Sequence, residues 1–268
     1  MAEPLADPLA DPATALPADR PPAPRTARER VREEMTAEIL AVARQHVAKD
    51  GAPGLSLRSI ARDLGMAPSA LYRYFGGRDA LLTALILAAY GSLATEAERA
   101  AEAAEPAAAE RNVSDAERFV AVPRAMRRWA LAHPHEWALI FGTPVPGYEA
   151  PEDTIEPYAR VAAALLRPLG EAHAAGRLRG RDGDGDGDGD SGEGRPVSAV
   201  LRDAVAPVAD ELLPGVPVGT VVRAVGAWTT VVGTISLEVF GHWRNTILHP
   251  EQFFDATVRD AADALGLR

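Results

Sequence analysis

The sequence predicts an all-helical protein, and three observations support this fold class. Apolar residues recur at helical spacing along most of the chain, and proline residues lie at most junctions between these stretches. No run of alternating apolar and polar residues between turn residues indicates a strand. With 268 residues, the chain can form one large or two small domains around a sizeable core.

The composition excludes several classes of protein. Apolar residues make up 47% of the chain and charged residues 25%, which excludes collagen, coiled-coil and wholly disordered proteins. The absence of cysteine excludes disulfides, thiolate metal sites and cysteine nucleophiles. No apolar stretch reaches the roughly 20 residues of a membrane span, and the N-terminus lacks the features of a secretory signal. We therefore expect a cytoplasmic protein with no membrane partner.

The formal net charge of −10 is unevenly distributed. Residues 25–79 contain ten basic and seven acidic residues, whereas residues 80–268 contain 17 basic and 27 acidic residues. A polyanion such as nucleic acid is therefore expected to bind within residues 25–79, if anywhere.

The first expected helix follows a Pro- and Ala-rich segment, residues 1–25, which we interpret as a disordered tail. The helix begins near Thr26 and ends at Asp50-Gly51, where glycine favours a C-cap. Its apolar stripe repeats every four residues and consists of Val31, Met35, Ile39, Ala43 and Val47.

Two short helices are expected next, joined by a turn at Gly65. Ser56 is the expected N-cap of the first, and Pro68 occupies the first helical position of the second. The expected buried side chains are Leu57, Ile60, Ala61 and Leu64 on the first helix and Leu71 and Phe75 on the second. This is the pattern of a helix-turn-helix, but similar helix pairs also occur in plain bundles. The pattern alone leaves both interpretations open.

A long Ala- and Leu-rich helix is expected from Arg78 to about Ala104, closed by Pro106. Further helices are expected over residues 114–132, 136–141, 154–175, 197–212, 218–242 and 251–265, and Pro123 should kink the first of them. The Gly/Asp-rich residues 180–195 are interpreted as a flexible acidic linker. The alternating Asp residues match the spacing of an EF-hand loop, but Gly189 replaces its usual apolar residue. We therefore assign no metal site.

The segment Gly54–Leu82 resembles the N-terminal domain of the tetracycline-repressor (TetR) family of bacterial regulators. The resemblance depends on the IA..LG block and its spacing from the LYRYF block, and the matching residues are Leu55, Ser56, Leu57, Ile60, Ala61, Leu64, Gly65, Pro68, Leu71, Tyr72, Tyr74, Phe75, Asp79 and Leu82. It implies a homodimeric regulator, usually a repressor. Its helix-turn-helix domain, residues 26–80, is joined by a long helix to a dimerising helical bundle, residues 81–268. Two residues depart from the family pattern: Ala67 replaces a capping Ser, and Arg78 replaces Lys.

The resemblance and the spacing together assign DNA contacts. Ser69 and Arg73 are expected to bond base edges, and Pro68 and Ala70 to contact thymine methyl groups. The phosphate contacts are assigned to Tyr72, Tyr74, Ser56, Arg58 and Arg78. The complete expected set is Ser56, Arg58, Ala67, Pro68, Ser69, Ala70, Tyr72, Arg73, Tyr74 and Arg78.

Residues 227–243 and 141–151 more weakly resemble one C-terminal subfamily that is common in actinobacteria. The resemblance implies a small-molecule pocket, and the aromatic residues suggest a small hydrophobic effector. The candidate lining residues are Met126, Trp129, Trp137, Phe141, Tyr148, Tyr158 and Trp228. At helical spacing, such residues also form ordinary cores.

The helix over residues 218–242 is apolar nearly all round, so that it needs burial on two sides. A two-fold homodimer would supply the second side, and the expected seam consists of Val222, Val225, Gly226, Thr229, Val232 and Gly233. The alternative is a central helix within a single bundle.

Other functions find less support in the sequence. The chain contains no nucleophile elbow, phosphate loop or dinucleotide fingerprint, and we expect neither an enzyme nor a cofactor. The only close histidine pair, His133 and His135, lacks an indicated third metal ligand. A helical protein-interaction or small-molecule-binding module without DNA binding, including a calcium-binding one, remains the alternative function.

Overall fold

The computed structural model describes residues 26–111, 113–179 and 197–268. Within these ranges the chain forms ten α-helices and two short 3₁₀ helices, with no strand, which confirms the all-helical prediction. The predicted tail, residues 1–25, and the predicted linker, residues 180–195, lie outside the described residues. The helices are α1 (Ala27–Asp50), η1 (Ala52–Gly54), α2 (Leu57–Asp63), α3 (Pro68–Leu71), α4 (Arg78–Arg111), α5 (Asp115–Ala132), α6 (Pro134–Phe141), η2 (Glu152–Thr154), α7 (Ile155–Ala174), α8 (Ala199–Leu212), α9 (Val218–Val239) and α10 (Pro250–Ala264).

The internal contacts divide the chain after Glu38, within α1. The N-terminal unit includes the beginning of this helix, where Thr26 and Glu29 form a capping box. The Glu29 N–H donates to Thr26 Oγ1 at 3.3 Å, and the Thr26 N–H donates to Glu29 Oε2 at 2.7 Å. Val31, the first residue of the apolar stripe, is 60% exposed. Among the described residues of its own unit, no second element is present to cover it.

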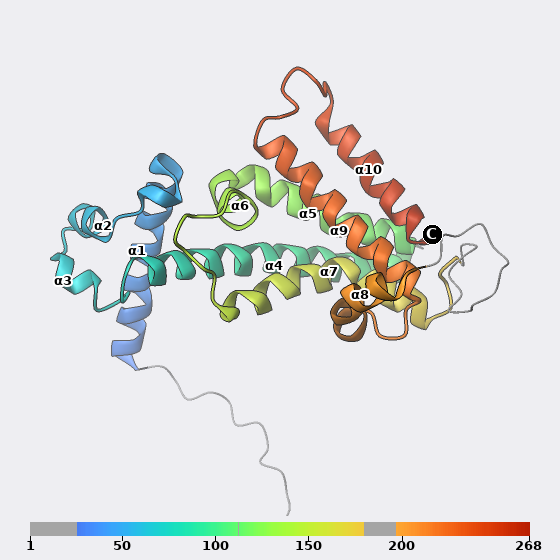
Figure 1. Ribbon diagram of the computed structural model, residues 1–268, viewed down its shortest axis with the longest axis horizontal. Helices are drawn as coiled ribbons and strands as arrows, with labels where there is room; N and C mark the ends of the chain where they lie inside the picture. Colours follow the sequence, from blue (N-terminus) through green and yellow to red (C-terminus); the bar gives the residue numbers. More distant parts are fainter. Residues whose placement is uncertain (1–25, 112, 180–196) are drawn as a thin grey trace, which may run out of the picture. The chain divides into compact units, whose positions relative to one another are not determined.

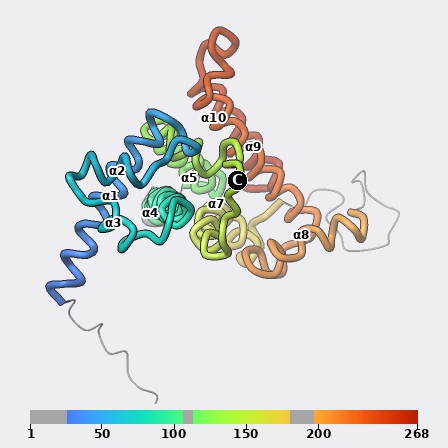
Figure 2. Tube along the Cα trace, turned by 60° about the vertical axis from the view of Figure 1, so that its left-hand side comes forward, coloured from blue at the N-terminus to red at the C-terminus, as the bar shows by residue number. Residues whose placement is uncertain are grey.

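The second unit, Ile39–Arg268, contains all the other helices. Helix α4 packs against α5 and α7, which also contact each other, as Figure 2 shows with α4 viewed nearly end-on. Helix α10 packs on α5 and α9, and α8 packs on α9 (Figure 1). The largest fully buried side chains include Phe119, Met126, Trp137, Leu165 and Phe254. The core thus lies among α4, α5, α7, α9 and α10.

Bidentate ion pairs join these helices at the edge of the core. Arg127 on α5 donates to both carboxylate oxygens of Glu238 on α9, at 2.7 and 2.6 Å. Arg124 donates to Asp255 on α10 at 2.9 and 2.6 Å. Because an arginine fork matches a carboxylate geometrically, such pairs fix the relative register of two helices.

The structure corrects the expected end of the long helix, because α4 continues through Pro106 to Arg111. Proline removes one hydrogen bond, but Ala and Glu on both sides have high helix propensity and offset this loss. Pro123, Pro168 and Pro207 likewise lie inside α5, α7 and α8. A single proline is therefore a weak signal for a helix end in this chain.

Candidate nucleic-acid interface and ligand pocket

Helix α2 begins at the predicted cap. Ser56 adopts extended backbone angles, and its Oγ accepts the Ser59 N–H at 3.5 Å. Leu57, Ile60 and Ala61 are buried as predicted. Arg58 lies in the first turn and is exposed, so that its guanidinium faces solvent at the helix end where anions are favoured.

The turn between α2 and α3 is a complete Schellman motif. The Met66 N–H donates to Ala61 O at 2.8 Å, and the Gly65 N–H donates to Arg62 O at 3.1 Å. Gly65 has a φ of 65°, a left-handed conformation that favours glycine. The predicted role of Gly65 in turning the chain is thus confirmed.

Helix α3 is shorter than expected and includes only Pro68–Leu71 as regular α-helix. After Leu71 the hydrogen bonds tighten, because the Arg73 N–H donates to Ala70 O and the Tyr74 N–H donates to Leu71 O. Phe75 still bonds back to Leu71 O at 3.1 Å. Leu71 is fully buried and Phe75 is 8% exposed, which confirms both as core residues.

The opposite face of this segment is open to solvent. Ala67 is the N-cap without a side-chain hydrogen bond, as the loss of the usual Ser predicts. The exposed residues are Ala67, Pro68, Ser69, Tyr72 and Arg73, and Ala70 and Tyr74 are half-buried. The solvent-facing side of this segment therefore carries small, polar and aromatic residues, whereas its other side lies in the core.

Arg78 is bound within the protein. Its Nη2 donates to Ala52 O at 3.0 Å and to Pro53 O at 3.4 Å, and its Nη1 lies 3.4 Å from Asp79 Oδ1. The arginine thereby holds the η1 turn against the beginning of α4. This fixes the entry to α2, an arrangement that the sequence does not indicate.

A second brace, also absent from the sequence prediction, joins α1 to α2. His46 Nε2 lies 2.8 Å from Asp63 Oδ2. The hydrogen bond with His46 lowers the pKa of the Asp63 carboxyl below its ordinary value. The end of α2 is therefore tied to α1 by a polar contact beside the Schellman turn.

An apolar pocket of about 220 Å³ lies among α7, α8 and α9. It is lined by Ile155, Tyr158, Ala159, Ala162, Leu166, Pro207, Val208, Glu211, Leu212, Ala224, Val225 and Trp228. Two of the predicted pocket residues, Tyr158 and Trp228, form its aromatic wall with ring centroids 5.5 Å apart. The contribution of α8 was missed, because its exposed apolar residues carry no pocket signal in the sequence.

The other predicted pocket residues have different surroundings. Met126 is fully buried in the core, and the indole N–H groups of Trp129 and Trp137 donate to the hydroxyls of Ser92 and Ser236. The Tyr148 hydroxyl lies 2.9 Å from Thr83 Oγ1. Each of these side chains therefore has a structural contact apart from the apolar pocket.

Phe141 belongs to an aromatic cluster behind the pocket wall, in which its ring contacts those of Tyr90, Trp137 and Trp228. The Tyr90 ring contacts Phe141 and Tyr158, each at a centroid distance of 5.9 Å. Burial, and secondarily the neighbouring Tyr158, raises the pKa of Tyr90 to about 12. The Tyr90 hydroxyl donates to Ile140 O at 3.1 Å. The pocket wall is thus supported by interlocked rings.

Helix α9 presents one face that no other described part of the chain covers. Gly226, Thr229, Leu237 and Phe240 are exposed, and Val222 and Gly233 are only half-buried. These positions follow helical spacing and lie opposite the buried Ala224, Ala227, Val231 and Ile235. Val225, assigned to the seam from the sequence, lines the apolar pocket.

Within the described ranges, two helices have the length and hydropathy of a membrane span: α4 over Arg78–Glu105, with a mean hydropathy of 1.5, and α9, with 1.3. Half of the apolar window of α4 is buried inside the fold, and so is 39% of that of α9. Both helices contribute to the core described above.

The two parts of the chain match two known domain families. Residues 39–85 match the bacterial regulatory proteins of the tetR family, and residues 119–261 match the tetracyclin repressor-like C-terminal domain. HTH-type transcriptional regulators of Mycobacterium tuberculosis (strain H37Rv) and Mycobacterium bovis are each 36% identical over 239 residues, which is 87% of this chain and 92% of the relative.

Solved structures of other proteins have a similar fold. The crystal structure of the regulatory protein SCO4313 is similar, with a TM-score of 0.68 and 32% identity over 89% of this chain and 100% of that one. A protein of unknown function from Rhodococcus sp. RHA1 has a TM-score of 0.57 and 25% identity over 92% of this chain and 97% of that one. With its helix-turn-helix and its matching C-terminal domain, the chain belongs to the TetR family of DNA-binding transcriptional regulators.

Proposed function

We propose that this chain is a ligand-responsive repressor that binds a palindromic operator as a homodimer. The exposed surface of α3 is the single observation that best supports the DNA-reading part. A helix held by buried Leu71 and Phe75 presents Ser69, Tyr72 and Arg73 to solvent. A major groove about 12 Å wide admits such a helix.

The roles of individual residues follow from chemistry and exposure. Ser69 and Arg73 bond base edges, while Pro68, Ala70 and Ala67 provide the small apolar contacts that thymine methyl groups accept. Tyr72, Tyr74, Ser56 and Arg58 contact phosphates. The internal hydrogen bonds of Arg78 make it chiefly a brace of this surface, with a phosphate contact as its second role.

Dimerisation would use the uncovered face of α9. A Cβ added at Gly226 or Gly233 would meet no described atom within 4 Å, so these glycines are not required by packing within the described part of the chain. A partner helix, by contrast, benefits from small residues because they permit close backbone approach. Two subunits would then present their α3 helices to half-sites one helical turn of about 34–36 Å, or a multiple of it, apart.

The effector would bind in the apolar pocket beside Tyr158 and Trp228. A volume of about 220 Å³ lies below the usual range for drug-sized ligands, and this favours a compact hydrophobic molecule. Such a ligand shifts the conformational equilibrium only through its different affinities for the DNA-competent and incompetent states. We infer that the protein acts in the cytoplasm, where operator DNA lies, and without catalysis.

An electrophoretic mobility shift on DNA from the protein's own upstream region tests the DNA-reading proposal. The assay uses two salt concentrations and nonspecific competitor. We expect a discrete, competitor-resistant shift at dimer stoichiometry that weakens at the higher salt concentration. Arg73→Ala should lose discrimination between this DNA and competitor. Arg128→Ala, which removes an exposed arginine on α5, is the control and should keep it. Genome-wide selection of bound DNA fragments extends the test to operators elsewhere in the genome. If the protein binds no DNA even at low salt, a protein-interaction module is favoured instead.

The effector site is tested with indole, a small neutral aromatic probe. We expect indole to raise the melting temperature of the wild type and not that of Trp228→Ala. Trp243→Ala is the matched control, because Trp243 packs on Phe253 outside the pocket. An equal response of all three proteins would exclude the pocket as the site of indole binding.

A further inference from the structure

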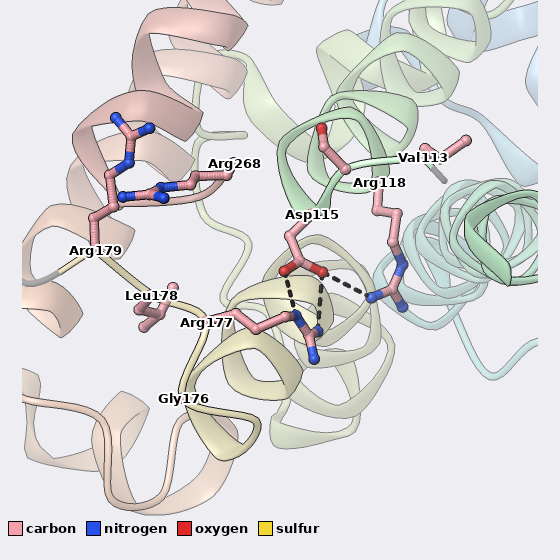
Figure 3. Close-up of a pocket in the computed structure, with 9 residues that line it drawn as sticks. Val113, Asp115, Arg118, Gly176, Arg177, Leu178, Arg179 and Arg268 are labelled. Atoms are coloured by element: carbon pink, nitrogen blue, oxygen red, sulfur yellow. Dashed lines mark hydrogen bonds and ion pairs between the residues drawn. The ribbon is translucent and has the colours of Figure 1, made fainter. Parts of the chain in front are cut away.

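A second cleft, distinct from the apolar pocket, lies beside the beginning of α5. Its volume is about 690 Å³, within the range typical of small-molecule sites. The lining residues are Val113, Ser114, Asp115, Arg118, Gly176, Arg177, Leu178, Arg179 and Arg268, and none of them lines the apolar pocket. Figure 3 shows the arginine side chains around this space.

Among the described lining residues, positive charge exceeds negative charge, because four arginines and a single carboxylate side chain line the cleft. The carboxylate, Asp115, is fully engaged. It accepts from Arg177 Nε at 2.8 Å and Nη2 at 3.1 Å, and from Arg118 Nη1 at 3.3 Å. The hydrogen bonds from Arg177 chiefly lower the pKa of the Asp115 carboxyl. Asp115 thus has no capacity left to neutralise Arg179 or Arg268.

Among the residues that the structure describes, no ion pair engages the two remaining guanidiniums, those of Arg179 and Arg268, so that they are available to a ligand. Figure 3 draws Arg179 and Arg268 on the other side of the cleft from Asp115, with no interaction to any residue shown. Arg118 is only 7% exposed, and its Nε is buried without a hydrogen-bond partner among the described residues. Arg118 also pairs with Asp115 and with Glu171, so that Arg179 and Arg268 contribute the positive charge that a bound anion would meet.

The backbone holds these arginines in place. The Arg179 N–H donates to Gly266 O at 3.0 Å, and the Ala116 N–H donates to Arg268 O at 2.9 Å. Gly266, with a φ of 78°, permits this approach, because a Cβ there would lie 2.6 Å from Arg179 O. Leu267, which follows Gly266 and precedes Arg268, is 3% exposed and packs in the hydrophobic core. The backbone at the site therefore needs little ordering when a ligand binds.

One further group favours an anion. The Ser114 hydroxyl caps α5 by accepting the Glu117 N–H at 3.2 Å, which leaves its own hydrogen free to donate into the cleft. The N–H groups of Ala116 and Glu117 in the first turn of α5 are already bonded, to Arg268 O and Ser114 Oγ, and are not available to a ligand. Because residues 80–268 carry ten more acidic than basic residues, the surroundings repel an extended polyanion more than a small one.

We propose that this cleft binds a small, multiply charged anion that carries phosphate or carboxylate groups. Both groups match the planar forks of Arg179 and Arg268. The site goes beyond the proposed repressor function and requires neither operator binding nor occupation of the apolar pocket. A bound anion would bridge α5, the segment after α7 and the end of α10.

Isothermal titration calorimetry of the full chain tests the proposal, with pyrophosphate and citrate as separate probes at constant ionic strength. We expect saturable binding at one site per chain. Stronger binding of pyrophosphate would identify a phosphorylated ligand class, and stronger binding of citrate a polycarboxylate. A charge-assisted hydrogen bond strengthens binding about tenfold or more. Arg179→Ala and Arg268→Ala should therefore each raise Kd about tenfold.

Arg128→Ala removes an equal charge from α5 outside the cleft and should leave Kd unchanged. Both cleft arginines are exposed, so their variants should melt like the wild type. They should also retain any DNA affinity, which separates this proposal from the repressor proposal. The anion site is refuted if neither probe binds saturably, or if Arg128→Ala weakens binding as much as the cleft variants do.

Discussion

Arg58 and Arg78 both begin helices of the DNA-binding domain, but their surroundings differ. Arg58 is exposed at the beginning of α2, whereas Arg78 donates to Ala52 O and Pro53 O. A free guanidinium can approach a phosphate without breaking an internal bond, which makes Arg58 the cleaner probe of the DNA backbone. Replacing Arg78 would combine a lost charge with a loosened η1 turn.

Arg58→Ala should weaken binding to every DNA sequence by a similar factor and leave sequence preference intact. A lost phosphate contact releases about one counterion fewer, so that the slope of log K against log salt should fall in magnitude by about 0.9 per subunit. Fluorescence anisotropy at several salt concentrations measures this slope. An unchanged slope would remove Arg58 from the phosphate contacts.

The Arg127–Glu238 pair connects α5 and α9, and the two side chains are only 15% and 12% exposed. The hydrogen bonds with Glu238 raise the pKa of Arg127. Glu238→Leu should lower the free energy of unfolding by about 3 kcal/mol, because it leaves the largely buried charge of Arg127 unpaired. The combined change Arg127→Met and Glu238→Leu should recover most of this loss. Urea unfolding of the four proteins of the double-mutant cycle gives the coupling energy between the two side chains. If the losses in unfolding free energy of the two single variants simply add in the double variant, the two side chains do not stabilise each other.

At the scale of elements, the turn and the two short helices follow from local sequence signals. Ser56 caps α2, Gly65 forms the left-handed turn and Pro68 begins α3, all as predicted. The end of α4 was wrong, because helix propensity on both sides of Pro106 outweighed one lost hydrogen bond. The sequence also contains no capping or helix-breaking residue that would predict the end of α3 at Leu71.

The uncovered face of α9 permits a test in which helix propensity and dimerisation have opposite effects. Replacing Gly226 and Gly233 by Ala should favour an isolated helix by roughly 1 kcal/mol per residue, since a Cβ meets no described atom within 4 Å at either position. Replacing both by Leu should break close helix packing across a dimer seam. Analytical ultracentrifugation should therefore show folded monomers for the Leu variant at concentrations where the wild type is dimeric.

Gly91 provides the matched control, because a Cβ there also meets no described atom within 4 Å and the residue lies on α4 rather than on α9. Gly91→Leu should remain dimeric. If the variant with Leu at positions 226 and 233 stays dimeric as well, the seam lies on another face of the protein.

At the scale of the whole molecule, ion pairs between helices link stability to pH. Hydrogen bonds from Arg124 and Arg177, respectively, chiefly lower the pKa values of Asp255 and Asp115 below the ordinary 3.8. A lowered pKa in the folded state means that the stabilisation is complete above 3.8 and is lost as the pH falls through the folded values.

The melting temperature should therefore fall as the pH decreases below about 3.8. Asp255→Asn should melt at a lower temperature at pH 7 and show a smaller further decrease in acid. Asp260→Asn, an exposed residue on the same helix, should follow the wild type. An identical acid response of Asp255→Asn and the wild type would show that this pair does not contribute to acid unfolding.

The sequence by itself determined the helical fold class, the helix-turn-helix and its buried residues except Leu64, which is only half-buried. These depend on short-range signals, namely capping residues, a glycine turn and apolar spacing within a few residues. Only the tertiary structure decided which aromatic residues line the apolar pocket, that Arg78 braces η1, and that Arg179 and Arg268 share a cleft with the beginning of α5. Those contacts join residues far apart in the chain, and their positions depend on how complete helices pack.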